Sequence, residues 1–572
     1  MTLTATAINE KVLELTGPEG FFETEDYTID GSTYKAYKHA PKNSVEIIQN
    51  GRGHGDAEFV IYEGRRYTYT QFYQLVDACA AALQAQGIAF GDRVAIAQRN
   101  CPEWIIGFAA ATLIGAIVVP INSWGKTEEL TYAIDDCGAR ALFCDPQRFA
   151  LIDDKLDSLA LDFIVVTGDE SDATKKIIGF DDLLAGVTDT EYTVAEPKPE
   201  DDCLILYTSG STGFPKGVRH RHIAVCQSLF NMMFTGFLVM SFEGAREFKG
   251  GATIETPLLT VPLFHATGLL SGFHLPLSTG QKVVMMYKWD TLKAMQLIEA
   301  ERVTSLSSVP AIVQDLLNHP EFDNHDTDSL IRVTGAGAAT PSGLPELINE
   351  KCGNPSRSAG YGMTETLAVA STQSGAIFDY KSYASGLLSP IMQMRSVDLD
   401  GNVLPRPQPG EIEMYGITCT PGYWQKPDAN KATFDEGRWM KSGDIGYVDD
   451  ENFVHITGRI KEIVIRGGEN IYPGEIEQVA YDLDPVHECV VFGEPDDALG
   501  EEMVMMVYLL PENPDSASTG EAQLREFLQS RLAGYKVPRK ILFADAPLPR
   551  NASEKLHKLK VREHYLNSLE TA

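Results

Sequence analysis

Short apolar runs of strand character alternate with helix-like segments along most of the chain, and this alternation limits the possible folds more than any other feature. Helices are predicted at residues 69–86, ending before Gly87, and at 128–137. Repeated βα alternation is typical of a layered α/β architecture, so we predict that class of fold. The predicted strands cover residues 92–97, 117–119, 141–144, 161–166, 203–207, 282–286, 303–308 and 330–334.

One apolar run, WIIGFAAATLIGAIVVPI at residues 104–121, is long enough to be mistaken for a membrane span. It contains two glycines and stops near Pro120, so we expect a buried helix to about Leu113, a turn and then a strand. The first residues, MTLTATAINEKVLEL, lack the basic and then apolar order of a secretory signal. We therefore expect a cytoplasmic protein without an integral membrane span.

Charge and cysteine content exclude several classes of protein. The formal net charge of −32 argues against nucleic acid or an anionic membrane as the main partner. Nine dispersed cysteines without a C-x-x-C pair indicate reduced thiols in a cytosolic protein, not a disulfide framework or a zinc site. The 572 residues exceed one ordinary core. The oligomeric state stays open, with a homodimer among the alternatives.

The character of the sequence changes twice in its last third. Residues 386–456 carry short strands with several prolines and glycines, which suggests a β-rich subdomain. From Gly458 the sequence GRIKEIVIRGGENIYPGEIEQVA has charge, a short strand, a double-glycine turn and a helix after Pro473. We predict a large N-terminal domain over 1–458 and a compact α+β C-terminal domain over 459–572.

The stretch YTSGSTGFPKGV at 207–218 follows a short buried strand and has the composition of a phosphate-binding loop. Glycines permit a close backbone approach, and successive N–H groups can form an anion-binding concavity. The nucleotide P-loop motif is not matched, because Pro215 precedes the lysine and Gly217 follows it. The groups expected to face a phosphate chain are Thr208, Ser209, Gly210, Ser211, Thr212, Gly213 and Lys216.

Four further stretches place small, hydroxylic or charged residues in loops. They are VTGAGAATP at 333–341, GYGMTET at 360–366, KSGDIGYVDDENFVHITGR at 441–459 and PLPRNASEKLHK at 547–558. With the 207–218 loop, and in this order, they resemble the adenylate-forming (ANL) superfamily. That superfamily includes acyl-CoA synthetases, coumarate–CoA ligases, firefly luciferases and the adenylation domains of peptide synthetases. The resemblance runs from about residue 60 to residue 562.

The resemblance implies an ATP-dependent, AMP-forming acyl-CoA ligase with a role in fatty-acid and lipid metabolism. Such an enzyme joins a carboxylic acid to ATP as an acyl-adenylate, releases pyrophosphate and passes the acyl group to coenzyme A. Attack of a carboxylate on a phosphate brings two anions together, so cations and aligned donors are needed. ATP, Mg²⁺ and coenzyme A are therefore the implied cofactors.

The resemblance also implies a role for each motif residue. Lys216 would help pyrophosphate leave, and Thr364 would contact a phosphate. Glu365 would hold Mg²⁺, a cation suited to carboxylate and phosphate oxygens. Asp444 would accept both ribose hydroxyls, with Arg459 beside it. The adenine ring would stack on Tyr361, next to Gly362, and lie against Gly337, Ala338 and Ala339.

The remaining roles concern the acid, the thiol and the second half-reaction. Lys555 would bridge the substrate carboxylate and the α-phosphate, and His265 would sit at the mouth of the acyl pocket. The family rotates its C-terminal domain about a hinge residue, which corresponds here to Lys461. The turn formed by Arg466, Gly467 and Gly468 would then line the path of the thiol.

One departure from the family pattern lies next to Lys555, where Glu554 replaces the usual glycine. Glutamate restricts the backbone and adds negative charge near an anionic reaction centre. We therefore expect the Glu554→Gly variant to release pyrophosphate at an equal or higher rate. A large loss of activity in that variant would mean that the loop has another role.

The identity of the acid is less constrained. The predicted helix at 225–238, VCQSLFNMMFTGFL, corresponds to the helix that lines the acyl tunnel in the family. Its phenylalanines and methionines suit an apolar chain or ring, although they equally suit a protein core. A medium- or long-chain fatty acid is the preferred interpretation. The alternatives are an aromatic, coumarate-type acid, an adenylating enzyme with another acceptor, and a nucleotide-binding sensor without chemistry.

Overall fold

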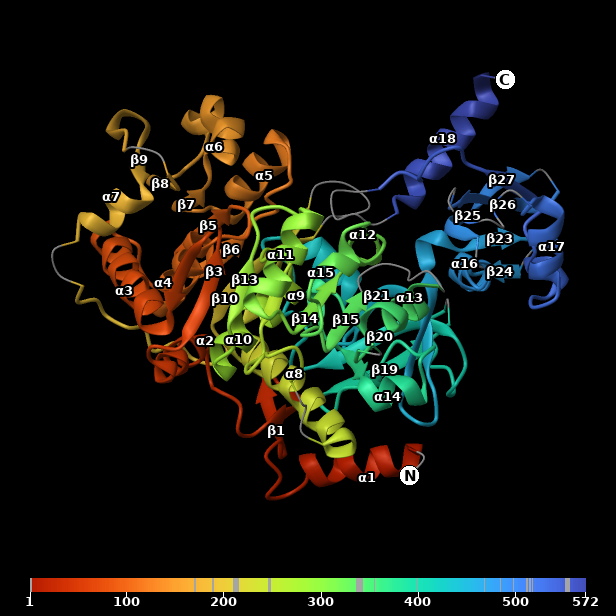
Figure 1. The fold of residues 1–572 in the computed structure, drawn as a ribbon, viewed down its shortest axis with the longest axis horizontal. Helices are drawn as coiled ribbons and strands as arrows, with labels where there is room; N and C mark the ends of the chain where they lie inside the picture. Colours follow the sequence, from red (N-terminus) through yellow and green to blue (C-terminus); the bar gives the residue numbers. More distant parts are fainter. Residues whose placement is uncertain are drawn as a thin grey trace.

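The computed structural model describes all but short stretches of the chain. The described residues are 3–168, 171–187, 190–208, 215–244, 248–335, 343–353, 355–398, 400–467, 469–483, 485–496, 498–510, 513, 516, 518–550 and 556–571. The large body carries several sheets, and a smaller domain follows it at the right of Figure 1.

The first large sheet has seven strands, and all neighbours are parallel except the pair β10–β11. Helices α3 (Tyr69–Ala85), α4 (Pro102–Leu113), α5 (Thr127–Cys137), α6 (Pro146–Ile152) and α7 (Phe180–Ala185) accompany it. The strand order is β11 (Lys216–Arg221), β10 (Asp202–Thr208), β6 (Ile117–Pro120), β5 (Arg93–Ala97), β7 (Ala141–Cys144), β8 (Phe163–Val166) and β9 (Ile177–Gly179).

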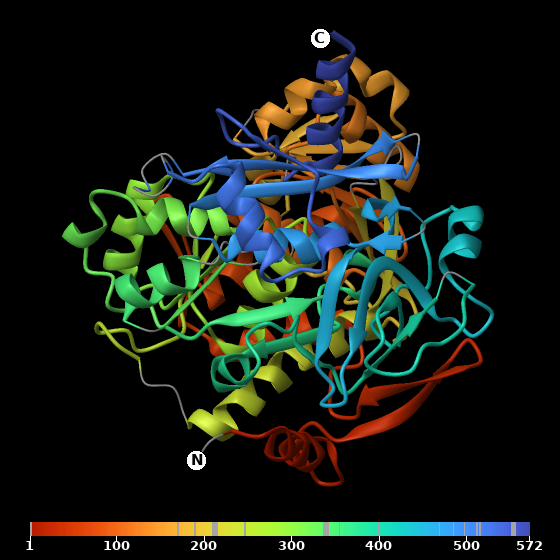
Figure 2. The ribbon, with the colours of Figure 1, turned by 90° about the vertical axis from the view of Figure 1, so that its right-hand side faces the viewer.

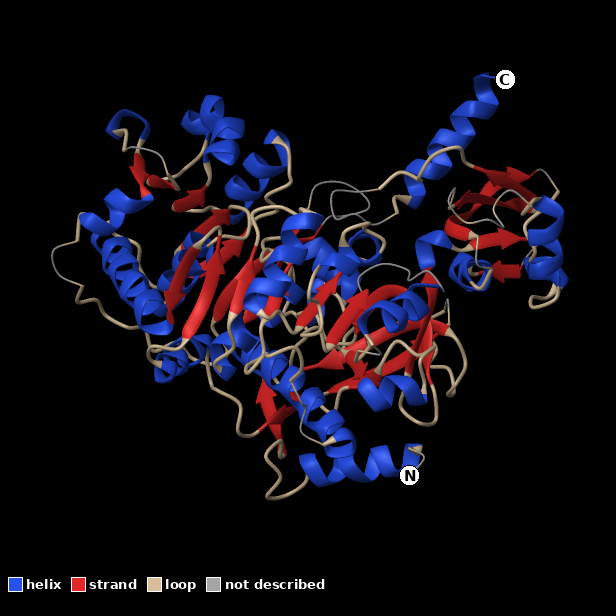
Figure 3. Ribbon diagram, viewed as in Figure 1, coloured by secondary structure: helices blue, strands red, loops and turns tan. Residues whose placement is uncertain are grey.

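The second large sheet has six strands and is parallel except for the pair β3–β4. Its helices are α9 (Ala266–Leu269), α10 (Leu275–Thr279), α11 (Thr291–Glu301), α12 (Pro310–Leu317) and α13 (Gly343–Cys352). The strand order is β15 (Arg332–Gly335), β14 (Ser305–Ser308), β12 (Pro257–Leu259), β13 (Val283–Met285), β3 (Glu58–Tyr62) and β4 (Arg65–Thr68). Figure 3 shows helices beside both sheets, which is the predicted layered α/β arrangement.

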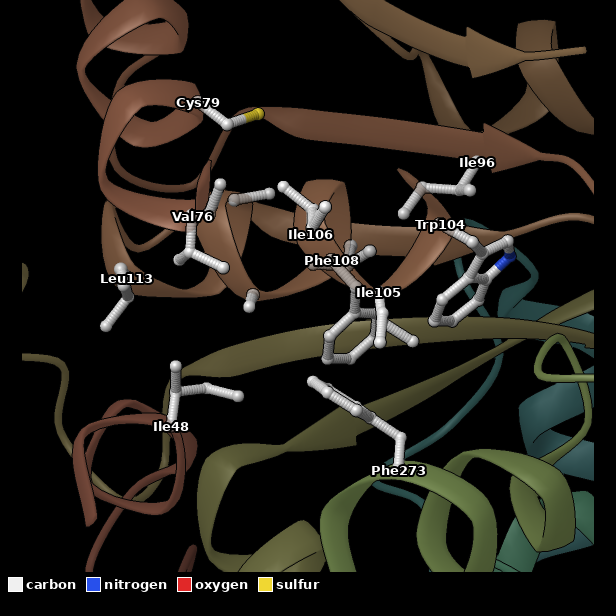
Figure 4. Packing of buried hydrophobic residues seen from close by; sticks show 14 of the residues in the cluster. Ile48, Val76, Cys79, Ile96, Trp104, Ile105, Ile106, Phe108, Leu113 and Phe273 are labelled. Carbon is white, nitrogen blue, oxygen red and sulfur yellow. The ribbon is translucent and has the colours of Figure 1, made fainter. Parts of the chain in front are cut away.

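Helix α4 explains how the apolar run at 104–121 is accommodated. Every residue from Pro102 to Leu113 is buried, and the run turns into the buried strand β6. Trp104 stacks on Phe108 at 5.3 Å between ring centroids, and Phe108 meets Phe273 edge-on at 5.8 Å. Figure 4 shows these rings inside one apolar cluster that also contains residues of both large sheets. The prediction that this run is core and not a membrane span is confirmed.

Residues 358–459 carry two antiparallel sheets, and the larger of them agrees with the β-rich character predicted for residues 386–456. Helices α14 (Gly375–Tyr380) and α15 (Pro427–Thr433) lie within this part of the chain. The smaller sheet contains β16 (Ser358–Tyr361), β17 (Ser371–Ser374) and β18 (Leu387–Leu388). The larger contains β19 (Met392–Val397), β20 (Gly410–Gly416), β21 (Met440–Val448) and β22 (Val454–Arg459).

The N-terminal segment packs on the long helix α8 (His222–Glu243), and both views show them side by side (Figures 1 and 2). Gln227 of α8 accepts from the backbone N–H of Tyr37 at 2.6 Å and donates to the Tyr37 carbonyl at 3.0 Å. Among the described residues, α8 alone is long and apolar enough to cross a membrane, but 67% of that stretch is buried in the protein. The segment comprises α1 (Ala5–Thr16), β1 (Thr24–Ile29), β2 (Ser32–Tyr37) and α2 (Ser44–Asn50).

The C-terminal part is a five-stranded sheet with three helices, in agreement with the predicted α+β unit. Its apolar cluster includes Val464, Ile476, Met505 and Leu528, each 1% exposed or less. The strands are β23 (Val464–Arg466), β24 (Glu469–Ile471), β25 (Val486–Asp496), β26 (Gly500–Leu509) and β27 (Lys540–Phe543). The helices are α16 (Pro473–Tyr481), α17 (Glu521–Gln529) and α18 (Lys558–Thr571).

Candidate active site

Asp444, Tyr361 and Arg459 meet where the two antiparallel sheets adjoin. Asp444 and Arg459 stand opposite each other on β21 and β22, and Arg459 Nε lies 3.1 Å from Asp444 Oδ1. Tyr361, the last residue of β16, donates its hydroxyl to Asp444 Oδ2 at 2.7 Å. The Asp444 carboxylate is therefore oriented from two sides, although the residue is only 7% exposed.

The backbone before Asp444 holds this carboxylate in place. Gly443 has φ +74°, a conformation that favours glycine. The Asp444 N–H donates to the Ser442 hydroxyl at 3.0 Å, and that hydroxyl donates to the Ile412 carbonyl on β20 at 2.7 Å. The Ser-Gly-Asp sequence thus fixes the backbone of β21 locally, next to the position where Asp444 pairs with Arg459.

The GYGMTET segment makes a tight turn that carries Thr364 and Glu365. A Cβ atom on Gly362 would lie 1.9 Å from the carbonyl oxygen of Ala368, so only glycine fits. The Thr366 hydroxyl accepts the Met363 N–H at 3.0 Å and closes the turn. Glu365 is presented on this turn and is 6% exposed. Gly362, beside Tyr361, is therefore required for steric reasons, which the composition of the motif did not reveal.

Tyr423 connects Glu365 with Lys216. Its hydroxyl donates to Glu365 Oε1 at 2.8 Å, and the Lys216 ammonium lies 5.0 Å from the centroid of its ring. The backbone supports this contact, because the Thr420 N–H donates to the Glu365 carbonyl at 2.7 Å. The sequence analysis missed Tyr423. The only available signal was an aromatic residue after Pro421-Gly422, which is too common to single out.

Burial makes the carboxyl groups of Glu365 and Asp444 costly to ionise. It raises the pKa of Glu365, nearby Asp444 raises it further, and the Tyr423 hydroxyl and the Lys216 charge oppose this effect. Burial likewise raises the pKa of Asp444 against the influence of Arg459 and Tyr361. Two buried carboxyl groups with raised pKa values favour added cations and hydroxyl donors, which is common at functional sites.

The phosphate-loop motif begins and ends in the hairpin β10–β11. Thr208 and Lys216 pair directly across this hairpin. A Cβ atom on Gly217 would lie 2.8 Å from Ile205 Cγ2, so the residue after the lysine must be small. The other predicted loop residues and several more fall outside the described residues: Ser209, Gly210, Ser211, Thr212, Gly213, Gly337, Ala338, Ala339, Gly468 and Lys555.

The other predicted site residues occupy separate surroundings. His265 precedes α9, and its ring lies 4.4 Å from that of Phe264, which meets Trp124 edge-on at 5.4 Å. Gly467, with φ +59°, lies in the hairpin between β23 and β24. Arg466 makes a two-pronged ion pair with Glu502 at 2.7 and 2.9 Å, so its charge is already compensated.

The structure changes the interpretation of helix α8. The sequence left its phenylalanines open between an acyl tunnel and a protein core, and Phe230 and Phe234 pack against Phe22 and Tyr37 of the N-terminal segment. These rings fill a core that residues 1–50, which carry no motif, help to build. Apolar composition alone does not tell which partner covers a helix face, and the structure favours the core alternative for these two residues.

The fold and the site together define a two-domain adenylate-forming enzyme. The chain belongs to the AMP-binding enzyme family, whose profile matches residues 48–424, and the AMP-binding enzyme C-terminal domain matches residues 475–555. The predicted superfamily and fold class are thereby confirmed, and the chain is an acyl-CoA ligase of the AMP-forming, acid–thiol type.

Relatives named for different acid substrates are about equally similar in sequence to this chain. The chain is 31% identical to the long-chain-fatty-acid–CoA ligase FadD13 of Mycobacterium tuberculosis, over 87% of this chain and 93% of that one. It is also 31% identical to a feruloyl-CoA synthase of Amycolatopsis, over 91% and 98%. Among solved structures, the anthranilate CoA ligase AuaEII in complex with anthranoyl-AMP matches with a TM-score of 0.81 and 26% identity, over 93% and 99%.

Proposed function

We propose that this acyl-CoA ligase activates a medium- or long-chain fatty acid. The observation that carries the proposal is the chemistry of α8, the helix beside the acyl tunnel in the family. Between Ile223 and Phe242 it has no charged side chain, and its first ten residues are buried. No ammonium or second carboxylate on a substrate would find a partner there, because buried charges need partners.

An aromatic, hydroxylated acid is the second candidate. Ala224, Ser228 and Met232 follow one another at helical spacing on α8. The Ser228 hydroxyl is fully buried, and within the described part of the chain it has no hydrogen-bond partner. A buried hydroxyl without a partner is unfavourable, so a polar ring substituent could satisfy it. The similarity to feruloyl-CoA synthase supports testing this alternative.

We propose that the adenylation site is the group of Lys216, Glu365, Tyr361 and Asp444. Asp444 binds the ribose hydroxyls, Tyr361 stacks on adenine, and Lys216 and Thr364 contact the phosphates. Mg²⁺ fits a site with one buried carboxylate, because this ion usually combines one or two carboxylates with substrate phosphates and water. When bound, it would neutralise phosphate charge, and Glu365, oriented by Tyr423, would hold it.

The C-terminal domain contributes the remaining groups. Lys555 approaches the substrate carboxylate for adenylation, and the Gly467-Gly468 turn borders the thiol path after rotation about Lys461. The large body contributes His265, which lies at the mouth of the acyl pocket in this proposal. Lys461 lies in a short helical turn, Ile460–Glu462, between the last strand of the large body and β23.

A panel of acids of graded length tests the proposal. Purified protein is incubated with ATP, Mg²⁺, coenzyme A and one acid at a time, and thioesters are identified by mass. We expect the largest kcat/KM for saturated acids of eight or more carbons, with ferulic and anthranilic acids at least tenfold lower. A preference for the aromatic acids would replace the first candidate with the second, and absence of any thioester would contradict both.

A further inference from the structure

Lys558, the first residue of α18, is held between two carboxylates of different elements. Its Nζ lies 2.7 Å from Glu477 Oε2 on α16 and 2.8 Å from Glu462 Oε2 in the turn Ile460–Glu462. Glu477 is 6% exposed, and its other oxygen accepts the Val491 N–H of β25 at 2.8 Å. Although burial opposes its charge, the two glutamates raise the pKa of Lys558, so the lysine stays protonated.

Lys558, Glu462 and Glu477 connect the chain beside the proposed hinge with the chain that follows Lys555. Glu462 directly follows Lys461, the proposed hinge residue, and Lys558 lies three positions after Lys555 in the sequence. The chain on the other side of the Lys555 segment is anchored as well. Buried Glu488 accepts the Leu548 N–H at 2.6 Å and pairs with Arg550. Arg550 and Leu556 form an antiparallel bridge, and the His557 N–H donates to the Pro549 carbonyl at 2.8 Å.

We propose that Lys558 is a positioning residue that ties the chain after Lys555 to the residue after the hinge. Glu462 then moves with the C-terminal domain, so rotation is confined to the bonds before it. Adenylation depends on this tie, because Lys555 must reach the reacting carboxylate accurately. Thioester formation from a finished acyl-adenylate depends on it little, because that step uses the Gly467 side of the domain. The inference rests on the proposed roles of Lys555 and Lys461.

The experiment compares the two half-reactions in four variants. Adenylation is measured as acid-dependent exchange of pyrophosphate into ATP, and the second step as thioester formation from synthetic acyl-adenylate and coenzyme A. We expect Lys558→Gln to lower the exchange rate by about 10- to 100-fold. Thioester formation should stay within about twofold of wild type, since misplacement of Lys555 does not affect it.

The other variants separate positioning from folding. Glu462→Ala removes the acceptor of Lys558 beside the hinge but leaves the Lys558–Glu477 pair intact, and it should lower exchange by about tenfold. Lys558→Arg keeps the charge and should recover most of the exchange rate. Lys560→Gln removes an exposed lysine of the same helix and should leave both rates unchanged. Equal losses in both half-reactions would reduce Lys558 to a purely structural residue and overturn the proposal.

Limited proteolysis tests the contact between Lys558 and Glu462 independently of any measurement of catalysis. Trypsin cleavage after Lys461 should be several-fold faster in Lys558→Gln than in Lys560→Gln, while cleavage elsewhere in the domain is similar. If wild-type protein forms no thioester with any acid, the proposed function fails, and this measurement still judges the tie. Unchanged cleavage after Lys461 contradicts it.

Discussion

Replacement of Glu365 by glutamine is expected to lower the rate of acyl-adenylate formation by about 100- to 1,000-fold, the usual loss when one preorganised charge partner is removed from a reacting centre. Glutamine keeps an oxygen that can accept the Tyr423 hydroxyl, so the turn should keep its shape. It removes the negative charge that would hold Mg²⁺ against the phosphates. The defect should therefore appear in the adenylation rate and in the Mg²⁺ concentration required.

The same substitution should leave the ligand-free protein at least as stable as wild type. Burial raises the pKa of Glu365 above its ordinary value of 4.5. An acid whose folded pKa is raised lowers stability once the pH exceeds its unfolded value, because the unfolded chain ionises more easily. At neutral pH a neutral glutamine avoids that cost. Urea unfolding and pyrophosphate release are measured together, with exposed Glu350→Gln as the control.

A combined loss of activity and stability in Glu365→Gln would contradict this account. It would mean that the carboxylate mainly supports the turn of residues 364–366 and does not serve the reaction. An unchanged adenylation rate would remove Glu365 from the proposed site altogether.

The parallel strands could be predicted from the sequence because they are buried on both faces. Such strands are continuous apolar runs, and β5, β7 and β10 begin and end within a residue of their predicted limits. The apolar run at 104–121 was resolved for a related reason, since its glycine turn and Pro120 leave too few residues for one long helix. Local glycine and proline positions, together with continuous apolar runs, were enough to predict these elements.

Other elements depend on partners that are distant in the sequence. Strand β11, KGVRHR, has no apolar run and exists because it pairs with β10. The sequence could not decide between core and tunnel for Phe230 and Phe234, because nothing in α8 reveals that residues 22 and 37 cover that face. The same limit applies to the site: the motifs supply Glu365 and Lys216, whereas Tyr423 joins them only through the fold.

Replacement of Lys555 by alanine is expected to separate the two half-reactions more sharply than any other change. We expect pyrophosphate exchange to fall by about 100- to 1,000-fold, because a cation aimed at the charge that develops during bond formation is lost. Thioester formation from synthetic acyl-adenylate should stay within about threefold of wild type, since the bond that needs the lysine already exists.

Lys555→Arg should give an intermediate rate, because a planar guanidinium keeps the charge but not the point geometry of an ammonium. Lys555→Ala should not alter the free energy of unfolding, since the anchors of the flanking chain, Glu488 and Glu477, remain in place. An alanine variant with unimpaired exchange would show that the cation comes from another residue, and equal losses in both steps would show that Lys555 serves the domain and not the adenylation chemistry.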